Sequence, residues 1–287
     1  MRGDKCLTYK NITTLGIVIG IDVGISTTKI VGLRKGKIVS PIRIKATDPV
    51  TSLYGAFGKF LHDNNIELED VEHVMLTGVG SDYIKGPVYG LPTDRTSEFI
   101  CDGLGAKYES GLNKMIVVSM GTGTTLVKYD AEEITHLGGL GMGGGTLAGL
   151  SRLMLGTDDI HHIEELAKNG NIKNIDLQIG DICPQEIPGL PTFATASLFG
   201  NAQQTTSHED IALGIICTVV QTIASATIMA SLGTDIKDFV MIGNLTLLPQ
   251  CKEVFDMMET LYGVRFHIPK CAEFSTAIGA ALSYKGK

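Results

Sequence analysis

The sequence predicts an α/β protein built from two domains of similar design that face each other across a cleft. Its 287 residues are enough for two domains of ordinary size. Each half opens with a β-branched strand, a Gly-rich turn and a Thr-rich strand, read as GIDVGISTTKIVGL in the first half and VVSMGTGTTLVKY in the second. A repeated supersecondary pattern indicates repeated domains, so we expect one domain over residues 1–112 and another over residues 113–287, the second carrying helical insertions.

The first half alternates apolar strands with helices. Apolar residues at helical spacing, Leu53, Phe57 and Phe60 among them, predict a helix after a three-stranded meander. Thr96 or Ser97 is able to cap a second helix. The expected elements are strands over 17–23, 27–33, 37–45 and 71–77, and helices over 49–65 and 96–110.

The second half repeats this order with longer helices. Residues 171–203 carry Pro and little periodicity, which favours an ordered excursion rather than a strand. Methionines 154, 229, 257 and 258 are expected in the core. The expected elements are strands over 115–120, 124–129, 133–137, 239–242 and 264–268, and helices over 145–156, 160–169, 209–232, 247–262 and 272–284.

Charge and cysteine content restrict the possible partners. The net charge is −7 and the chain has no basic run, which argues against nucleic acid. The six cysteines form no CxxC motif, so we expect reduced thiols and a cytoplasmic location. We also expect no signal peptide and no membrane segment, because the apolar stretch after residue 16 is short and interrupted by Asp22.

Three Gly-rich loops are suited to binding phosphate. Loops 24–26 and 121–123 each join two strands, where Gly lets successive backbone amides converge on an anion. Loop 138–145 leads into a helix N-terminus, which favours an anion electrostatically. Asp22 and Lys29 flank the first loop and suit Mg²⁺ and phosphate oxygens respectively. Each loop alone is compatible with a simple turn; three together favour a phosphate-binding protein.

Several motifs resemble a known family. GIDVGISTTK, TGVG, SMGTGTT and IGN are similar to motifs of the actin, hexokinase and Hsp70 ATPase superfamily, and the chain more closely resembles type II pantothenate kinases. The matching segments keep their order: SEFICDGLGA, VVSMGTGTTLVKYD, HLGGLGMGGGTLAGLSRLMLG, IEELAKNGNIKNIDLQIGDI, PGLPTFATASLFGN, VMIGN and AEFSTAIGAALSY. The resemblance implies two ribonuclease H-like, actin-like ATPase domains flanking a nucleotide cleft. It also implies ATP- and Mg²⁺-dependent phosphorylation of pantothenate to 4′-phosphopantothenate, the first step of coenzyme A biosynthesis.

The resemblance also implies roles for individual residues. Glu98 matches the family's general base, although a carboxylate at this place could equally complement a helix N-terminus. Asp22 would organise Mg²⁺, and Gly243 and Asn244 would lie near the nucleoside. The residues that would face the triphosphate are Gly24, Ser26, Thr27, Thr28, Lys29, Thr122, Gly123, Gly143, Gly144 and Gly145.

Two residues depart from the family pattern, and alternatives stay open. Ile25 stands where family members carry Gly, and His136 stands where they carry an Arg that contacts the acyl substrate. A neutral His does not replace the bidentate contact of an Arg with a carboxylate, so the identity of the acceptor stays open; Arg152 and Arg95 are the candidate substitutes. The alternatives are a pantetheine-like or other small-alcohol kinase, an activator of a 2-hydroxyacyl-CoA dehydratase, and a non-catalytic sensor. The apolar helix over 211–232 is compatible with a homodimer or with burial in a monomer.

Overall fold

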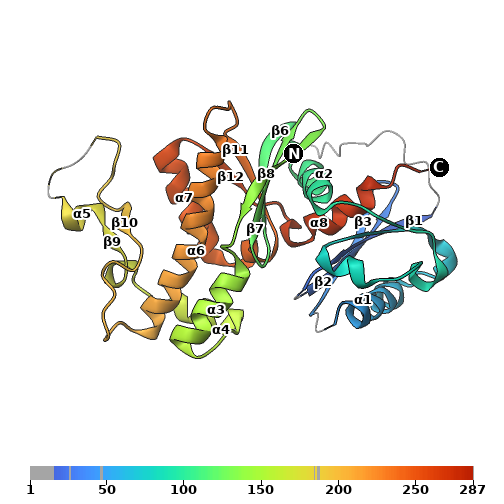
Figure 1. The fold of residues 1–287 in the computed structure, drawn as a ribbon, viewed down its shortest axis with the longest axis horizontal. Helices are drawn as coiled ribbons and strands as arrows, with labels where there is room; N and C mark the ends of the chain where they lie inside the picture. The colour runs from blue at the N-terminus through green and yellow to red at the C-terminus, as the bar shows by residue number, and fades with distance from the viewer. Residues whose placement is uncertain (1–15, 26, 46–47, 184, 186–187, 287) are drawn as a thin grey trace, which may run out of the picture.

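The computed structural model describes residues 16–25, 27–45, 48–183, 185 and 188–286. They form two five-stranded sheets, each with flanking helices (Figure 1). The strand orders are β3-β2-β1-β4-β5 and β12-β11-β6-β7-β8. The α/β class with two similar halves is therefore confirmed. The boundary at residue 112 stays a prediction.

The first sheet begins with the predicted meander. β1 pairs antiparallel with β2 and parallel with β4, because a crossover containing α1 separates the meander from β4. Asp48 caps α1 by accepting a hydrogen bond from the Thr51 amide at 2.7 Å. The elements are β1 (Ile17–Val23), β2 (Thr27–Arg34), β3 (Lys37–Lys45), α1 (Pro49–Asn64), β4 (Val71–Thr77) and β5 (Thr93–Arg95).

The second sheet repeats this topology. β6, β7 and β8 form an antiparallel meander, and β11 and β12 extend the sheet in parallel with β6. The helices on its outer face enclose an apolar core around α6. The elements are β6 (Lys114–Met120), β7 (Thr124–Asp130), β8 (Glu133–Leu140), α3 (Gly144–Leu155), α4 (Ile160–Ala167), α6 (His208–Ser231), β11 (Asp238–Ile242), α7 (Pro249–Tyr262) and β12 (Arg265–His267).

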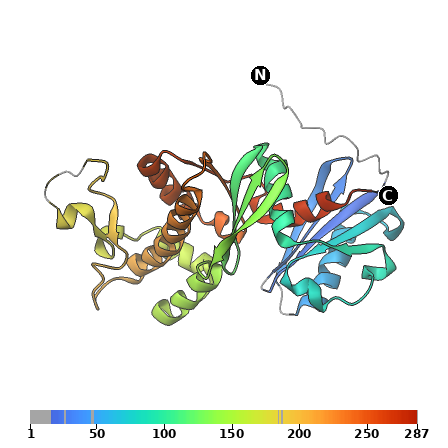
Figure 2. The same ribbon diagram turned by 45° about the horizontal axis from the view of Figure 1, so that its top comes forward.

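Two helices lie between the sheets and join them. α2 (Glu98–Ser110) packs on the second sheet, and α8 (Ser275–Ser283) packs on the first (Figures 1 and 2). The helices approach closely at two glycines: a Cβ on Gly105 would overlap the backbone of Ser275, and one on Gly279 would overlap that of Cys101. The two lobes are thus joined through the direct contact of α2 with α8.

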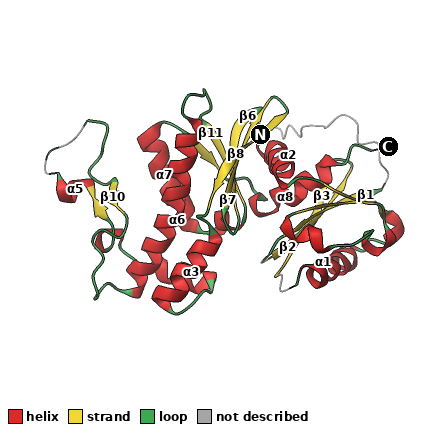
Figure 3. Cartoon of the chain, in the orientation of Figure 1, coloured by secondary structure: helices red, strands yellow, loops and turns green. Residues whose placement is uncertain are grey.

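Three expectations need correction. The excursion contains two short antiparallel strands, β9 (Leu177–Gln178) and β10 (Thr195–Ser197), and one helical turn, α5 (Ile179–Ile182), and it projects from the helical end of the second lobe (Figure 3). Strands this short show no sequence periodicity. Of the four methionines expected in the core, Met154 and Met229 are exposed. α6 is long and apolar enough to cross a membrane by length and composition, which we did not predict, but 56% of its most apolar window is buried in the protein.

Candidate active site between the lobes

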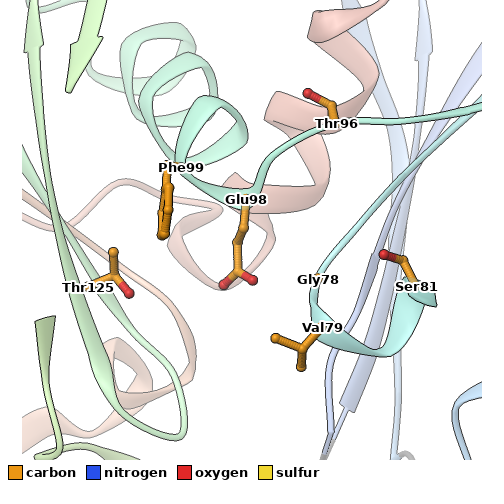
Figure 4. Close-up of a pocket in the computed structure, with 7 residues that line it drawn as sticks. All are labelled: Gly78, Val79, Ser81, Thr96, Glu98, Phe99 and Thr125. Atoms are coloured by element: carbon orange, nitrogen blue, oxygen red, sulfur yellow. The ribbon is translucent and has the colours of Figure 1, made fainter. Parts of the chain in front are cut away.

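A pocket of about 420 Å³ lies between the two lobes (Figure 4). The first lobe contributes the turn after β4, and the second contributes Thr125 of β7. The start of α2 projects Glu98 and Phe99 into the space between them (Figure 4). The lining residues are Gly78, Val79, Ser81, Thr96, Glu98, Phe99 and Thr125.

Glu98 is the first residue of α2, two residues later than the helix start that we predicted at Thr96. The Thr96 amide instead donates to the Leu76 carbonyl at 3.0 Å, which keeps Thr96 beside the end of β4. Ser97 occupies the N-cap position without a side-chain hydrogen bond. The carboxyl group of Glu98 therefore lies at the mouth of the helix, directed into the pocket.

The surroundings of Glu98 favour its protonated form. Burial and, to a smaller extent, the negative charge of Asp22 raise the pKa of Glu98 to about 7, and the positive charge of Lys29 opposes the rise. A carboxyl group with a pKa near neutrality can both accept and release a proton at physiological pH. A general base requires this behaviour.

Asp102 lies one helical turn after Glu98 and was not predicted as part of the site. It is fully buried, and its Oδ1 accepts a hydrogen bond from the Thr276 hydroxyl of α8 at 2.6 Å. Burial raises the pKa of Asp102 to about 8, and the charge of Glu98 contributes to the rise. The i,i+4 spacing from Glu98 was a signal available in the sequence. Cys101, expected to be a buried small residue, is fully buried.

The first Gly-rich loop joins β1 and β2. The Gly24 amide donates to the Thr27 carbonyl at 3.0 Å and closes the turn. Nζ of Lys29 lies 3.6 Å from Oδ2 of Asp22, and Thr28 is fully buried with no hydrogen-bond partner for its hydroxyl among the described residues. Ser26 lies outside the described residues. The loop thus presents a carboxylate and an ammonium group at one strand end, whereas the Thr28 hydroxyl is buried.

The loops of the second lobe pack directly on one another. The Gly144 and Gly145 amides donate to the carbonyls of Gly121 and Thr122 at 2.8 and 2.9 Å. A Cβ on Gly143 would lie 2.6 Å from the Thr122 carbonyl oxygen and 2.8 Å from the carbonyl carbon of Gly123. Gly is therefore needed at 143 because two backbone segments meet there. The structure brings both predicted loops to the N-terminus of α3.

A third segment of the second lobe reaches the first lobe. Nδ2 of Asn244 lies 3.4 Å from the Thr27 hydroxyl, which makes a long hydrogen bond between the lobes. Gly243 has φ +97°, and a Cβ there would lie 2.5 Å from the Met120 carbonyl oxygen. The buried Oδ1 of Asn244 has no hydrogen-bond partner in the part of the chain that the structure describes. The contact between Asn244 and Thr27 therefore brings one predicted loop of each lobe together.

The two departures from the family pattern have different settings. Ile25 is 60% exposed at the tip of the first loop. The His136 ring stacks on Phe99, with ring centroids 4.1 Å apart and planes within 4°. Arg95 and Arg152, the two candidate substitutes for an Arg at position 136, both have partners elsewhere. Arg95 donates to the carbonyl of Ser81, and Arg152 forms an ion pair with Asp158.

These residues suit phosphate and a cation bound with it. Converging amides, a helix N-terminus and Lys29 can neutralise phosphate oxygens. The carboxylate of Asp22 suits Mg²⁺, which in nucleotide sites commonly takes one or two carboxylates and completes its shell with water and phosphate. The described residues contain no group of three or more His, Cys, Asp or Glu side chains that could hold a metal by themselves. Asp22 therefore fits a metal that arrives with a phosphate ligand.

The sequence of the chain is similar to those of type II pantothenate kinases. Residues 105–261 match the Fumble family. The type II pantothenate kinase of Staphylococcus aureus strain MRSA252 is 31% identical over 235 residues, covering 76% of this chain and 85% of that protein. The type II pantothenate kinase of Staphylococcus epidermidis strain RP62A is 29% identical over 281 residues, covering 91% of this chain and 98% of that protein.

Solved structures share the fold at lower sequence identity. The activator of the 2-hydroxyisocaproyl-CoA dehydratase from Clostridium difficile, with bound ADPNP, aligns over 93% of each chain with a TM-score of 0.68 and 18% identity. A ROK-family glucokinase from Streptomyces griseus, in complex with glucose and AMPPNP, covers 93% of this chain and 98% of that chain with a TM-score of 0.58 and 12% identity. At these identities the likeness concerns the actin-like ATPase fold.

Proposed function

The chain belongs to the type II pantothenate kinase family, and we propose from this premise that it transfers the γ-phosphoryl group of ATP to the hydroxyl group of pantothenate. The observation that carries the proposal is the carboxyl group of Glu98, which projects into an interlobe pocket beside the phosphate-suited loops. The product would be 4′-phosphopantothenate, and the reaction would begin coenzyme A biosynthesis.

In the proposed reaction Glu98 is the general base. The acceptor oxygen attacks the γ-phosphorus, the bond from that phosphorus to the β,γ-bridging oxygen breaks, and ADP leaves with the electron pair. The hydroxyl proton passes to Glu98. Because burial raises the pKa of Glu98 to about 7, the carboxylate binds this proton more readily than an exposed Glu would.

The loops would position ATP rather than react with it. The N-terminus of α3 and the amides of loop 121–123 would face the phosphates from the second lobe, and Lys29 from the first. Asn244, whose buried Oδ1 is unpartnered among the described residues, would lie near the nucleoside with Gly243. The proposed triphosphate contacts are Gly24, Ser26, Thr27, Thr28, Lys29, Thr122, Gly123, Gly143, Gly144 and Gly145.

Asp22 would hold Mg²⁺ directly or through water. When bound with ATP, the ion neutralises part of the negative charge on the β- and γ-phosphates. Asp22 lies at the end of β1 beside Lys29, so both charges of the pair would face the nucleotide from one strand end. A single carboxylate suffices for this role, because the phosphates and water complete the coordination shell.

A coupled assay of ADP release tests the proposed function. We expect release that depends on both Mg²⁺ and pantothenate, together with appearance of the phosphorylated acceptor by mass spectrometry. ADP release at the same rate with and without an acceptor would refute the proposed kinase reaction. Turnover with another alcohol, and none with pantothenate or its derivatives, would keep the kinase and discard this acceptor.

The alternative function is activation of a 2-hydroxyacyl-CoA dehydratase, favoured by the fold similarity to such an activator. Activators of this kind bridge an iron–sulfur cluster between subunits through cysteines. Here Cys101, Cys217 and Cys251 are buried, and burial raises the pKa of each thiol to about 12. Such thiols are poor iron ligands, so we favour the kinase. Iron bound stoichiometrically to anaerobically purified protein, with visible absorbance, would support the activator instead.

The setting proposed for the enzyme follows from its charge and relatives. We propose a cytoplasmic enzyme that acts on small molecules, without nucleic-acid or membrane partners, and that forms a homodimer through helices of the second lobe. The exposed apolar residues Met229 and Leu232 near the end of α6 suit such a contact. Light scattering during size-exclusion chromatography tests the dimer, and a mass equal to one chain of 30.6 kDa would refute it.

A further inference from the structure

The acceptor side of the pocket has an unusual electrostatic character. Glu98 is the one ionisable side chain among the seven described residues that line the pocket. The other side chains there are hydroxyl-bearing, aliphatic or aromatic. Asp22 adds a second carboxylate close enough to raise the pKa of Glu98. An acceptor with a negative charge therefore approaches carboxyl groups and meets no cation in this lining.

The neighbouring guanidinium groups do not compensate. Nε of Arg95 donates to the Ser81 carbonyl at 3.4 Å, and its Nη2 donates to the Ile84 carbonyl. Both bonds direct the guanidinium group to the backbone of the turn after β4. Arg152, in the last turn of α3, is held by Asp158.

Two lysines on strands near the pocket, Lys29 and Lys128, also supply no free cation to its lining. Lys29 lies 3.6 Å from Asp22, at the strand end assigned to phosphate. Lys128 of β7 is three residues after Thr125, and since side chains alternate along a strand it points to the opposite face of the sheet. A carboxylate at the far end of an acceptor thus finds no free partner among these groups.

Phe99 lines this end of the pocket, and the exposed His136 ring stacks on it from outside the lining, so that the two rings form an aromatic wall. Their rings are stacked at 4.1 Å, and Phe99 is 37% exposed where it lines the pocket. His136 lies on β8 opposite Val127 of β7, so the wall continues from the strand pair that also carries Thr125. A flat aromatic surface favours contact with apolar or amide groups. A carboxylate in the same place would lose hydration, which costs free energy.

From this lining we propose that the Phe99–His136 wall selects an acceptor whose far end is uncharged, so that an amide derivative of pantothenate is a better substrate than pantothenate itself. The inference rests on the proposed kinase function, because Glu98 must lie at the reacting hydroxyl for the far end to extend along the wall. His136 is then the specificity-determining residue. A cation placed there would supply the partner that a carboxylate lacks.

The test compares two acceptors that differ in one group. Pantothenate and its primary amide have the same length and shape, and only the first is charged. For the wild-type protein we expect kcat/KM to be at least about tenfold higher for the amide, a difference of about 1.4 kcal/mol. In His136→Arg we expect the ratio of amide to acid to fall by at least about tenfold, because a charge-assisted hydrogen bond stabilises the carboxylate.

A matched variant separates this effect from a general change in charge. His161→Arg places the same substitution on the exposed surface of α4, away from the pocket, and should leave the ratio unchanged. Thermal unfolding and binding of an ATP analogue confirm that both variants are folded. A wild-type preference for the acid, or a ratio that His136→Arg does not alter, would overturn the inference while the kinase remains. Absence of turnover with both acceptors would instead overturn the proposed function and the inference with it.

Discussion

Replacing Glu98 by Gln removes the proposed base while keeping nearly the same side-chain volume. General base catalysis contributes about 10²- to 10⁴-fold to a rate. We therefore expect kcat to fall by this factor in Glu98→Gln, which corresponds to roughly 3–5 kcal/mol of transition-state stabilisation. The affinity for ATP should change little, because none of the residues proposed to contact the triphosphate lines the pocket that contains Glu98.

The pH dependence of the rate gives a second and sharper signature. Burial and the charge of Asp22 raise the pKa of Glu98 to about 7, and the base works only when ionised. Below that pH the wild-type rate should fall by about tenfold for each pH unit, since the ionised fraction falls by that factor. Mg²⁺ beside Asp22 would remove part of the repulsion and move this limb toward lower pH. In Glu98→Gln the limb should be absent.

The assay is coupled ADP release at saturating ATP, Mg²⁺ and acceptor, measured across the pH range. Glu69→Gln, an exposed carboxylate on the surface of the first lobe, is the matched control and should keep both the rate and the limb. A loss of less than about tenfold in Glu98→Gln, or a surviving acidic limb, would show that another group accepts the proton.

Three further predictions concern stability, the phosphate loops and the metal. Asp102→Asn should keep the acceptor for the Thr276 hydroxyl; because the pKa of Asp102 is raised to about 8 from about 3.9 in the unfolded chain, the wild type loses stability as pH rises through this window. The variant should therefore unfold at a higher temperature than the wild type near pH 8, and at the same temperature as the wild type near pH 4. A variant that unfolds at a lower temperature than the wild type at both pH values would contradict this. Gly143→Ala should raise the KM for ATP by at least about tenfold through overpacking of two loops, whereas Gly149→Ala, which has open space at its Cβ position, should not. Asp22→Asn should raise the Mg²⁺ concentration for half-maximal rate by about 10- to 100-fold, and an unchanged Mg²⁺ titration would exclude Asp22 as the metal's carboxylate.

Local sequence patterns predicted the sheets well because strands and their turns are encoded locally. The bounds of β1, β3 and β4 agree with the predicted ranges, since β-branched runs end at glycine or polar turns. β9 and β10 were missed because strands of two and three residues exist through pairing with each other and not through their own propensity. The same holds for β5, which is ordered by its parallel pairing with β4.

The sequence indicated several residues of the candidate site, but it did not predict which of them contact one another. The Gly-rich loops and Asp22 could be identified from residue types and spacing, whereas Glu98 came from family resemblance. The contact of Asn244 with Thr27 joins residues 217 positions apart, and no local pattern encodes it. The burial of Asp102 depends on which face of α2 meets α8, which is decided by the close approach at glycines far apart in the sequence.

The position of Glu98 at the head of α2 has a mechanical consequence. α2 packs on the second sheet but contacts α8, which packs on the first, and the Asp102–Thr276 bond links the two helices one turn below Glu98. The proposed base is therefore held where the two helices that join the lobes meet. The phosphate-suited loops lie on both lobes, so a change in the angle between the sheets alters their separation. An ATP molecule held by both sets of loops would thus be brought to a base that is already in place.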